Sequence, residues 1–128
     1  MQRINMSQDI ISDILNGIMN AKRARKAELS ITRNSKLLVQ ILGIMKQYGY
    51  IDYEINDGKI KIMIKELNEC RAVKPRYAVG KKDIEKYIRR FLPARNFGFV
   101  IISTSKGLMT HQEAQENKIG GSIIAYFY

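Results

Sequence analysis

Two alternating segments joined by a turn signal constrain the fold of this chain more than any other feature. Residues 50–55 and 59–65 alternate apolar and polar side chains, which is the period of a half-buried β-strand. The Asn-Asp-Gly sequence at 56–58 favours a tight hairpin turn, because these residue types tolerate positive φ. The hairpin places two apolar sets on one face: Ile51, Tyr53 and Ile55 on the first strand, and Ile60, Ile62 and Ile64 on the second.

Two amphipathic helices and a short strand precede this hairpin. Apolar side chains recur at helical spacing over about residues 8–21 and again in a second helix that ends at Gly49. Asn34 or Ser35 is the expected N-cap of that second helix. Between the helices, residues 28–32 alternate as a short strand does. The first part of the chain therefore reads α-β-α-β-β.

Short strands and short helices are expected in the rest of the chain. Val73 and Tyr77–Val79 are predicted to form brief strands on either side of Pro75. Beyond them the pattern predicts a helix over residues 84–91, a buried strand over 99–104, a helix from a capping box at Thr110 to about Lys118 that ends in paired glycines, and a closing strand over 122–128.

These elements predict an α+β chain of two small α/β domains. Residues 1–66 are expected to form the N-terminal α-β-α-β-β domain. Residues 67–128 are expected to form a mainly β C-terminal domain with short helices. The hydrophobic content of 45% is enough for packed cores.

The charge of the chain limits its partners. Twenty-two basic against twelve acidic residues leave a formal net charge of +10, which makes nucleic acid the leading class of partner. An anionic membrane surface also suits a basic chain, but no apolar run approaches the roughly 18 residues that span a bilayer. The N-terminus lacks the apolar core of a signal peptide, and Cys70 is the single cysteine. We therefore expect a cytoplasmic protein with no intramolecular disulfide and no membrane partner.

Residues suited to catalysis are sparse. His111, the only histidine, lies at the start of a predicted helix, where an exposed side chain with a structural role is expected. Cys70 alone cannot build a zinc site, and Asp57 is explained by the hairpin turn. No glycine spacing matches a phosphate-binding loop or a dinucleotide fingerprint. The sequence therefore predicts no enzyme, no metal, no cofactor and no small-molecule substrate.

Basic residues gather where they suit a phosphate backbone, although a solvated surface is the alternative explanation. Arg33 and Lys36 flank the expected start of the second helix, whose free backbone N–H groups attract anions. A cluster in the expected loop between the first helix and the first strand contains Lys22, Arg23, Arg25 and Lys26. A more dispersed cluster, suited to an RNA duplex, contains Lys74, Arg76, Lys81, Lys82, Lys86, Arg89, Arg90 and Arg95.

A polar loop after the strand at 99–104 is the most specific candidate site. Ser103, Thr104 and Ser105 offer three hydroxyls beside Lys106 and Gly107. The alternative is a turn in which Ser and Thr bond the local backbone, but that explains one or two hydroxyls rather than three. A-form RNA displays 2′-hydroxyls in a wide, shallow minor groove, which short hydroxyl side chains and a close backbone fit. The loop therefore favours recognition of RNA by shape and hydroxyl contacts.

Three aromatic residues close the chain. Tyr126, Phe127 and Tyr128 follow one another on the last predicted strand. Packing against the core is expected for at least two of them, and stacking of one ring on an RNA base is the alternative.

Motifs along nearly the whole chain resemble one protein family in order. They are Asp13, Leu15, Ile18, Asn20 and Ala21, then Ser35-Lys36, Gly49-Tyr50-Ile51, Leu67-Asn68 and Cys70, then Pro75-Arg76-Tyr77, Leu92-Pro93-Ala94-Arg95 and Phe97-Gly98, and finally Ser103 to Gly107 and Gly120-Gly121. This pattern resembles the universal small-subunit ribosomal protein family number eight, in its archaeal and eukaryotic branch.

The resemblance implies a structural protein of the small ribosomal subunit that binds a stem in the central domain of small-subunit ribosomal RNA and supports subunit assembly. It implies neighbouring small-subunit proteins as further partners. The implied RNA contacts are Ser103, Thr104, Ser105, Lys106 and Gly107, with Ser35, Lys36, Pro75 and Arg76 as further candidates. An alternative is a translational regulator that recognises a messenger RNA mimic of the ribosomal stem, since one surface would suit both.

Overall fold

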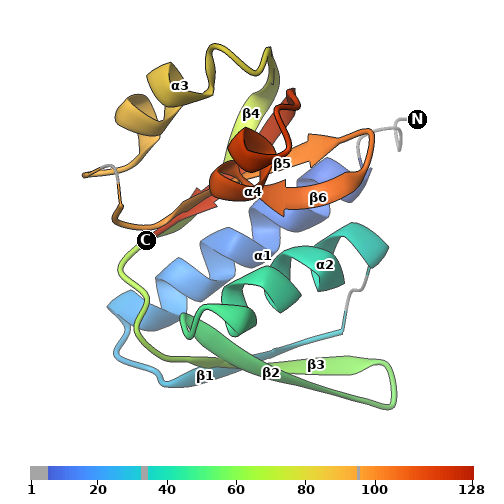
Figure 1. Ribbon diagram of the computed structural model, residues 1–128. Helices are drawn as coiled ribbons and strands as arrows, with labels where there is room; N and C mark the ends of the chain where they lie inside the picture. The colour runs from blue at the N-terminus through green and yellow to red at the C-terminus, as the bar shows by residue number, and fades with distance from the viewer. Residues whose placement is uncertain (1–5, 33–34, 95) are drawn as a thin grey trace. The chain divides into compact units, whose positions relative to one another are not determined.

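The computed structural model describes residues 6–32, 35–94 and 96–128, and of residues 6–9, 75 and 77 it describes the backbone. The chain divides into two compact units, Met1–Cys70 and Arg71–Tyr128 (Figure 1). The division falls a few residues beyond the border that we expect from sequence after residue 66. In the part of the chain that the structure describes, no helix combines the length and the apolar character needed to cross a membrane.

The first unit has the predicted order α-β-α-β-β. Helices α1 and α2 cover one face of an antiparallel sheet with strand order β1-β3-β2 (Figure 1). Its elements are α1 (Met6–Arg23), β1 (Glu28–Ile31), α2 (Lys36–Gln47), β2 (Ile51–Asn56) and β3 (Lys59–Ile64). The apolar stripe of each helix is buried, with Leu15, Ile18, Leu38 and Ile41 almost fully covered.

The β2–β3 hairpin confirms the predicted turn and register. Asn56 pairs with Lys59, so the loop is the two residues Asp57 and Gly58, with φ of 51° and 78°. Positive φ at both positions is the geometry that suits the twist of a hairpin. The apolar residues face one another as predicted, in the pairs Ile51 with Ile64, Tyr53 with Ile62 and Ile55 with Ile60.

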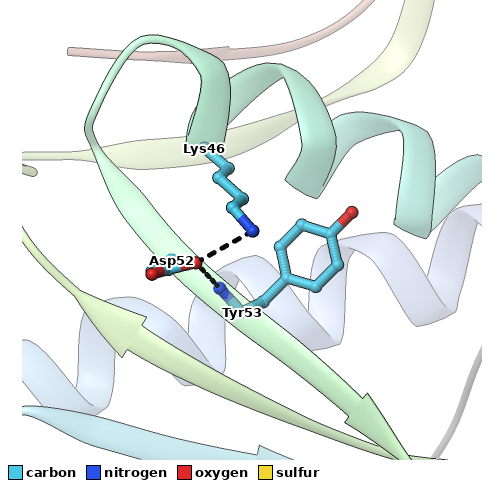
Figure 2. Close-up of polar contacts among 3 residues, drawn as sticks. All are labelled: Lys46, Asp52 and Tyr53. Atoms are coloured by element: carbon cyan, nitrogen blue, oxygen red, sulfur yellow. Dashed lines mark hydrogen bonds and ion pairs between the residues drawn. The ribbon is translucent and has the colours of Figure 1, made fainter.

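A polar contact ties the end of α2 to β2 (Figure 2). Lys46 Nζ lies 3.2 Å from Asp52 Oδ1, and the backbone N–H of Tyr53 donates to the same oxygen at 2.8 Å. The Lys46 ammonium also lies 5.2 Å from the centre of the Tyr53 ring. The hydrogen bond from Lys46, with that from Tyr53, lowers the pKa of Asp52.

The second unit is built on an antiparallel sheet with strand order β4-β7-β5-β6. Its elements are β4 (Cys70–Val79, which begins at the last residue of the first unit), α3 (Ile84–Phe91), β5 (Phe99–Thr104), β6 (Gly107–Thr110), α4 (His111–Glu116) and β7 (Gly121–Phe127). A core cluster from α3 and the sheet includes Ile84, Ile88, Val100, Ile102 and Ile123.

Two strands of this sheet differ from the sequence prediction. The two brief strands expected around Pro75 form one continuous strand, β4. Because β4 lies at the edge of the sheet, one side of its backbone needs no ladder partner, and proline is tolerated there. Strand β6 was not predicted, because its four residues are too few to show an alternating pattern.

His111 is buried, with 2% of its surface exposed, so the expectation of an exposed side chain is wrong. It lies one position past the last β5–β6 pair, Ile101 with Thr110. There its Nδ1 accepts the backbone N–H of Val100 at 3.2 Å, in place of a ladder carbonyl. His111 therefore has the expected structural role, but as a buried hydrogen-bond acceptor rather than as an exposed side chain.

Acidification is expected to destabilise the wild type more than a His111→Asn variant. Burial lowers the pKa of His111, and the charge of Glu85 only partly opposes this. Below about pH 6.5 the unfolded chain therefore takes up a proton that the folded chain resists, and the stabilisation present above that pH is lost. Asparagine keeps an acceptor near the position of Nδ1 but does not titrate. Urea unfolding between about pH 7 and 5 measures the free energy of unfolding of both proteins. An identical decline of this free energy in the wild type and the variant would contradict the prediction.

Candidate nucleic-acid interface

The polar loop after β5 is the turn of a hairpin. Thr104 pairs with Gly107, so Ser105 and Lys106 form a two-residue connection into β6. The Thr104 hydroxyl donates to the Gly107 carbonyl at 2.8 Å and accepts the Lys106 N–H at 3.1 Å. This hydroxyl is therefore used to build the turn, which leaves Ser103 and Ser105 as the donors and acceptors that a ligand would meet.

The rest of the hairpin tip is open to solvent. Ser105, Lys106 and Gly107 are exposed, and Ser103 is partly exposed. Gly107 has a φ of 108°, which favours glycine, and a Cβ at this position would meet nothing within 4 Å. The backbone on this side of the turn can therefore be approached closely.

Strand β7 adds a hydroxyl that sequence analysis missed. Ser122 pairs directly with Ser103, so the two side chains share a face of the sheet. The hydroxyls of Ser103, Ser105 and Ser122 make no hydrogen bond to the residues that the structure describes. Only the strand register places Ser122 beside the hairpin, and no local sequence signal does so.

The paired glycines pack strands together rather than ending α4. Helix α4 ends at Glu116, and Lys118, with a φ of 54°, takes the left-handed position after it. A Cβ on Gly120 would overlap the carbonyl of Val79, and one on Gly121 would overlap the carbonyl of Ser103. The glycines therefore let β7 start close to β4 and β5.

The basic cluster of the first unit surrounds the end of α1. Lys22 and Arg23 lie in the last helical turn, whereas Arg25 and Lys26 follow it, so only half of the cluster is in a loop. The N–H of Lys26 donates to the carbonyl of Ala21 at 2.9 Å, and that of Arg25 to Lys22 at 3.0 Å. This is a Schellman motif with Arg25, at a φ of 62°, in the position where glycine is usual. All four cations are exposed.

Arg25→Gly is expected to stabilise the protein and weaken RNA binding together. Removing the side chain relieves the steric cost of the left-handed backbone conformation, which is about 1–2 kcal/mol. Part of this gain is offset because glycine increases the conformational entropy of the unfolded chain. If Arg25 contacts a phosphate, as the sequence predicts, its removal makes the salt dependence of RNA binding shallower by about one unit. Thermal unfolding and salt titration measure the two effects.

Lys118→Gly is the matched control for this variant. Lys118 occupies the same position of a Schellman motif, with Ile119 donating to Ala114 at 3.0 Å, and lies outside the proposed contacts. We expect a similar stabilisation with an unchanged salt slope. Equal salt slopes in both variants would show that Arg25 makes no phosphate contact.

Ser35 and Lys36 begin α2. The Ser35 hydroxyl accepts the N–H of Leu38 at 3.1 Å, which confirms it as the N-cap. Lys36 is exposed, and the first turn has no acidic residue. Arg33 lies outside the described residues. Strand β1 carries the chain from the end of α1 to the opposite end of the unit (Figure 1). The structure therefore does not bring this helix start together with the cluster at 22–26.

Ser35→Asp and Ser35→Asn separate capping from phosphate binding. Both residues are good N-caps, so the free energy of unfolding should stay within about 0.5 kcal/mol of the wild type. Aspartate places a negative charge where a phosphate would lie, and RNA affinity should fall several-fold for it but not for asparagine. Filter binding at low salt measures both. Equal affinity of the two variants would argue against a phosphate at this helix start.

The remaining candidates lie on β4. Arg76 is exposed, and of Pro75 the structure describes the backbone. Of the dispersed basic cluster, the described residues Lys74, Arg76, Lys81, Lys82, Lys86, Arg89 and Arg90 are all exposed, and Arg95 lies outside the described residues. Within the described ranges, no group of three or more His, Cys, Asp or Glu is placed to hold a metal ion.

Comparison with known proteins decides the family. The family model described as "Ribosomal protein S8" matches residues 9–128. The chain belongs to this family. It is 45% identical over 129 residues to the small ribosomal subunit protein uS8 of Nanoarchaeum equitans, covering 96% of this chain and all of the relative.

Eukaryotic and archaeal relatives agree. Small ribosomal subunit protein uS8A of Schizosaccharomyces pombe is 40% identical over 94% of this chain and 98% of its own length. The uS8 protein of Thermoplasma acidophilum is 40% identical over 96% of this chain and 100% of its own length. The resemblance to the archaeal and eukaryotic branch of the S8 family is thereby confirmed. Membership makes the chain a structural ribosomal protein of the small subunit rather than an enzyme, with the cytoplasmic ribosome as its location.

Proposed function

We propose that the chain binds a stem in the central domain of small-subunit ribosomal RNA and supports assembly of the subunit. The observation that carries this proposal is the β5–β6 hairpin, which holds Ser103 and Ser105 with hydroxyls unused by the described protein residues beside exposed Lys106 and Gly107. Hydroxyls and a bare backbone suit the 2′-hydroxyls of an RNA minor groove. Contacts with neighbouring small-subunit proteins belong to the same proposal.

The cations of the first unit contribute electrostatic attraction to the RNA backbone, in addition to the hydroxyl contacts of the hairpin. Lys22, Arg23, Arg25 and Lys26 at the end of α1 attract the RNA backbone without regard to sequence. Ser35, Lys36 and Arg33 at the start of α2, and Pro75 and Arg76 on β4, are further candidate contacts. The hairpin then provides discrimination, because hydroxyl contacts depend on local RNA shape.

Salt dependence tests this division of roles. A central-domain fragment and an unrelated duplex of equal length are each titrated from low to physiological salt. Phosphate attraction alone weakens steeply with salt for both RNAs. We expect the ribosomal fragment to stay bound where the control dissociates, and a parallel loss of both would contradict specific recognition.

The regulatory alternative uses the same surface. A messenger RNA that mimics the ribosomal stem would meet the same hairpin hydroxyls. Recovery of messenger RNA with the tagged protein from cells favours this role, whereas a purely structural role predicts ribosomal RNA only.

A further inference from the structure

Five aromatic side chains form a connected series on the second unit. Tyr87 and Phe91 lie on α3, Tyr126 on β7, Tyr128 just after β7, and Phe97 in the loop before β5. Neighbouring ring centroids are 6.5 Å apart for Tyr87 and Phe91, 5.1 Å for Phe91 and Tyr126, 6.4 Å for Tyr126 and Tyr128, and 5.8 Å for Tyr128 and Phe97. The first three pairs are close to parallel, with interplanar angles of 20°, 23° and 9°.

These rings are only partly buried against the core of the second unit. Phe127 is 1% exposed, and because side chains alternate along a strand, Tyr126 and Tyr128 point to the other face. Both tyrosines pack on the edge of the core cluster and stay partly exposed. Phe97 is 46% exposed, and it is the one large apolar side chain of the second unit that is exposed among the described residues.

Glycine holds Phe97 beside the end of the chain. Gly98 has a φ of 102°, and a Cβ there would overlap the carbonyl of Phe127 and the Cβ of Tyr128. The absence of a side chain at Gly98 therefore lets the backbone of Tyr128 approach, which sets its ring against that of Phe97.

Cations flank one end of the series. Lys86 Nζ lies 5.9 Å from the centre of the Tyr87 ring, and Arg90 Cζ lies 5.9 Å from the centre of the Phe91 ring. Arg89 and Arg90 occupy the last turn of α3 and are exposed. The series thus has a cationic end on α3 and an apolar end at Phe97 and Tyr128.

We propose that this aromatic series is a second RNA contact, which stacks unpaired bases at Phe97 and Tyr128 while the cations of α3 hold the adjoining phosphates. The inference rests on the proposed function, because it adds single-stranded RNA to a chain proposed to bind an RNA stem. Aromatic faces beside basic side chains are the combination that binds unpaired nucleotides. A positive flank and a net charge of +10 favour a polyanion over an apolar protein segment.

The sheet relates this surface to the hydroxyl hairpin. Strand β5 runs from Phe99, paired with Phe127, to Ser103, paired with Ser122. Four residues of strand span about 13 Å. Tyr126, paired with Val100, lies on the face of the sheet that carries the core cluster, whereas Ser103 and Ser122 lie on the opposite face. One RNA therefore reaches both places only if its stem lies on the hairpin and its unpaired nucleotides pass around an edge of the sheet.

The test compares one stem with and without an adjoining unpaired segment. A Phe97→Leu/Tyr128→Leu variant keeps apolar bulk but removes two ring faces. We expect it to bind the stem with the unpaired segment about 10-fold more weakly than the wild type, and to bind the blunt stem equally well. The salt slope should not change, because no phosphate contact is removed.

Ser103→Ala/Ser105→Ala is the matched variant at the hairpin. It should lose affinity for both RNAs, whereas the aromatic variant should lose affinity only for the RNA with the unpaired segment. Failure of the proposed function would therefore appear in the serine variant, and failure of this inference in the aromatic variant. Unchanged binding of the unpaired RNA by the aromatic variant overturns the inference and leaves the surface to packing or a protein partner. Equal losses on both RNAs by a variant that unfolds as the wild type does also overturn it, because the two rings then make no contact specific to the unpaired segment.

A measurement on the wild type covers the case in which the aromatic variant does not fold. With ¹³C-labelled tyrosine, addition of an unpaired oligonucleotide should shift the ring signals of Tyr128 and leave those of Tyr53, in the first unit, unchanged. Absence of a selective shift overturns the inference. A selective shift without stem recognition supports it while refuting the proposed stem binding.

Discussion

Replacing Gly121 with alanine is expected to lower the free energy of unfolding by about 3 kcal/mol, at the upper end of the usual cost of overpacking. The added Cβ would overlap the carbonyl oxygen of Ser103 and lie 2.9 Å from its carbonyl carbon and 3.0 Å from Ile102 Cγ2. Two of these three atoms belong to the backbone of the paired strand, which cannot rotate away as a side chain does. Relief requires β7 to move from β5. Urea unfolding followed by circular dichroism measures the loss.

Two helical glycines provide controls for this variant. A Cβ on Gly17 would lie 3.6 Å from Leu29 Cδ1, and one on Gly43 would lie 3.7 Å from the Tyr53 hydroxyl, both ordinary contacts. Alanine favours the helix over glycine by about 1 kcal/mol, so Gly17→Ala and Gly43→Ala should be neutral or stabilising. If Gly121→Ala instead stays within about 0.5 kcal/mol of the wild type, β7 adjusts freely and the close approach does not constrain the sheet.

Local signals carried most of the prediction for the first unit. The Asn-Asp-Gly turn fixes the hairpin register, Ser35 caps α2 and Gly49, at a φ of 82°, ends it. Each of these features acts within a few residues, so the sequence alone reveals it. The end of α1 has no such local signal, because Arg25 takes the left-handed position that glycine usually marks in a sequence.

Features of the second unit depend on contacts between distant residues. Strand β4 is continuous through Pro75 because it lies at a sheet edge. The residues of β4 alone do not indicate that it takes this edge position. His111 is buried because it completes the ladder beside Val100, whose partner is set by the β5–β6 register. Periodicity within a short segment contains neither fact.

The sequence predicts a candidate site at the turn after β5 but does not distinguish its hydroxyls. Three adjacent hydroxyls predict a polar turn, yet the hydroxyl of Thr104 is hydrogen-bonded to Gly107 and Lys106 within the turn. Ser122 joins the surface only through its pairing with Ser103. The roles of Gly120 and Gly121 likewise required the packing of strands. Residue type indicated the chemistry, and strand register decides which atoms are available for it.

The pair Ser103→Ala and Ser105→Ala is expected to lower affinity for the ribosomal stem by about 5- to 150-fold. Each lost hydrogen bond to RNA contributes roughly 0.5–1.5 kcal/mol, and the two together about 1–3 kcal/mol. The free energy of unfolding should stay within about 0.5 kcal/mol of the wild type, because neither hydroxyl bonds the described part of the protein. Isothermal titration at physiological salt, where phosphate attraction is weakened, measures the loss.

Thr104→Val provides the contrasting variant, since it removes a hydroxyl of the same turn and keeps the shape of the side chain. Its hydroxyl donates to Gly107 and accepts from Lys106, so the variant should lose about 1 kcal/mol of stability. Its effect on RNA should be smaller than that of the serine pair, because this hydroxyl is already used. A larger loss of affinity from Thr104→Val than from the two serines would mean that RNA recognises the shape of the turn rather than its free hydroxyls.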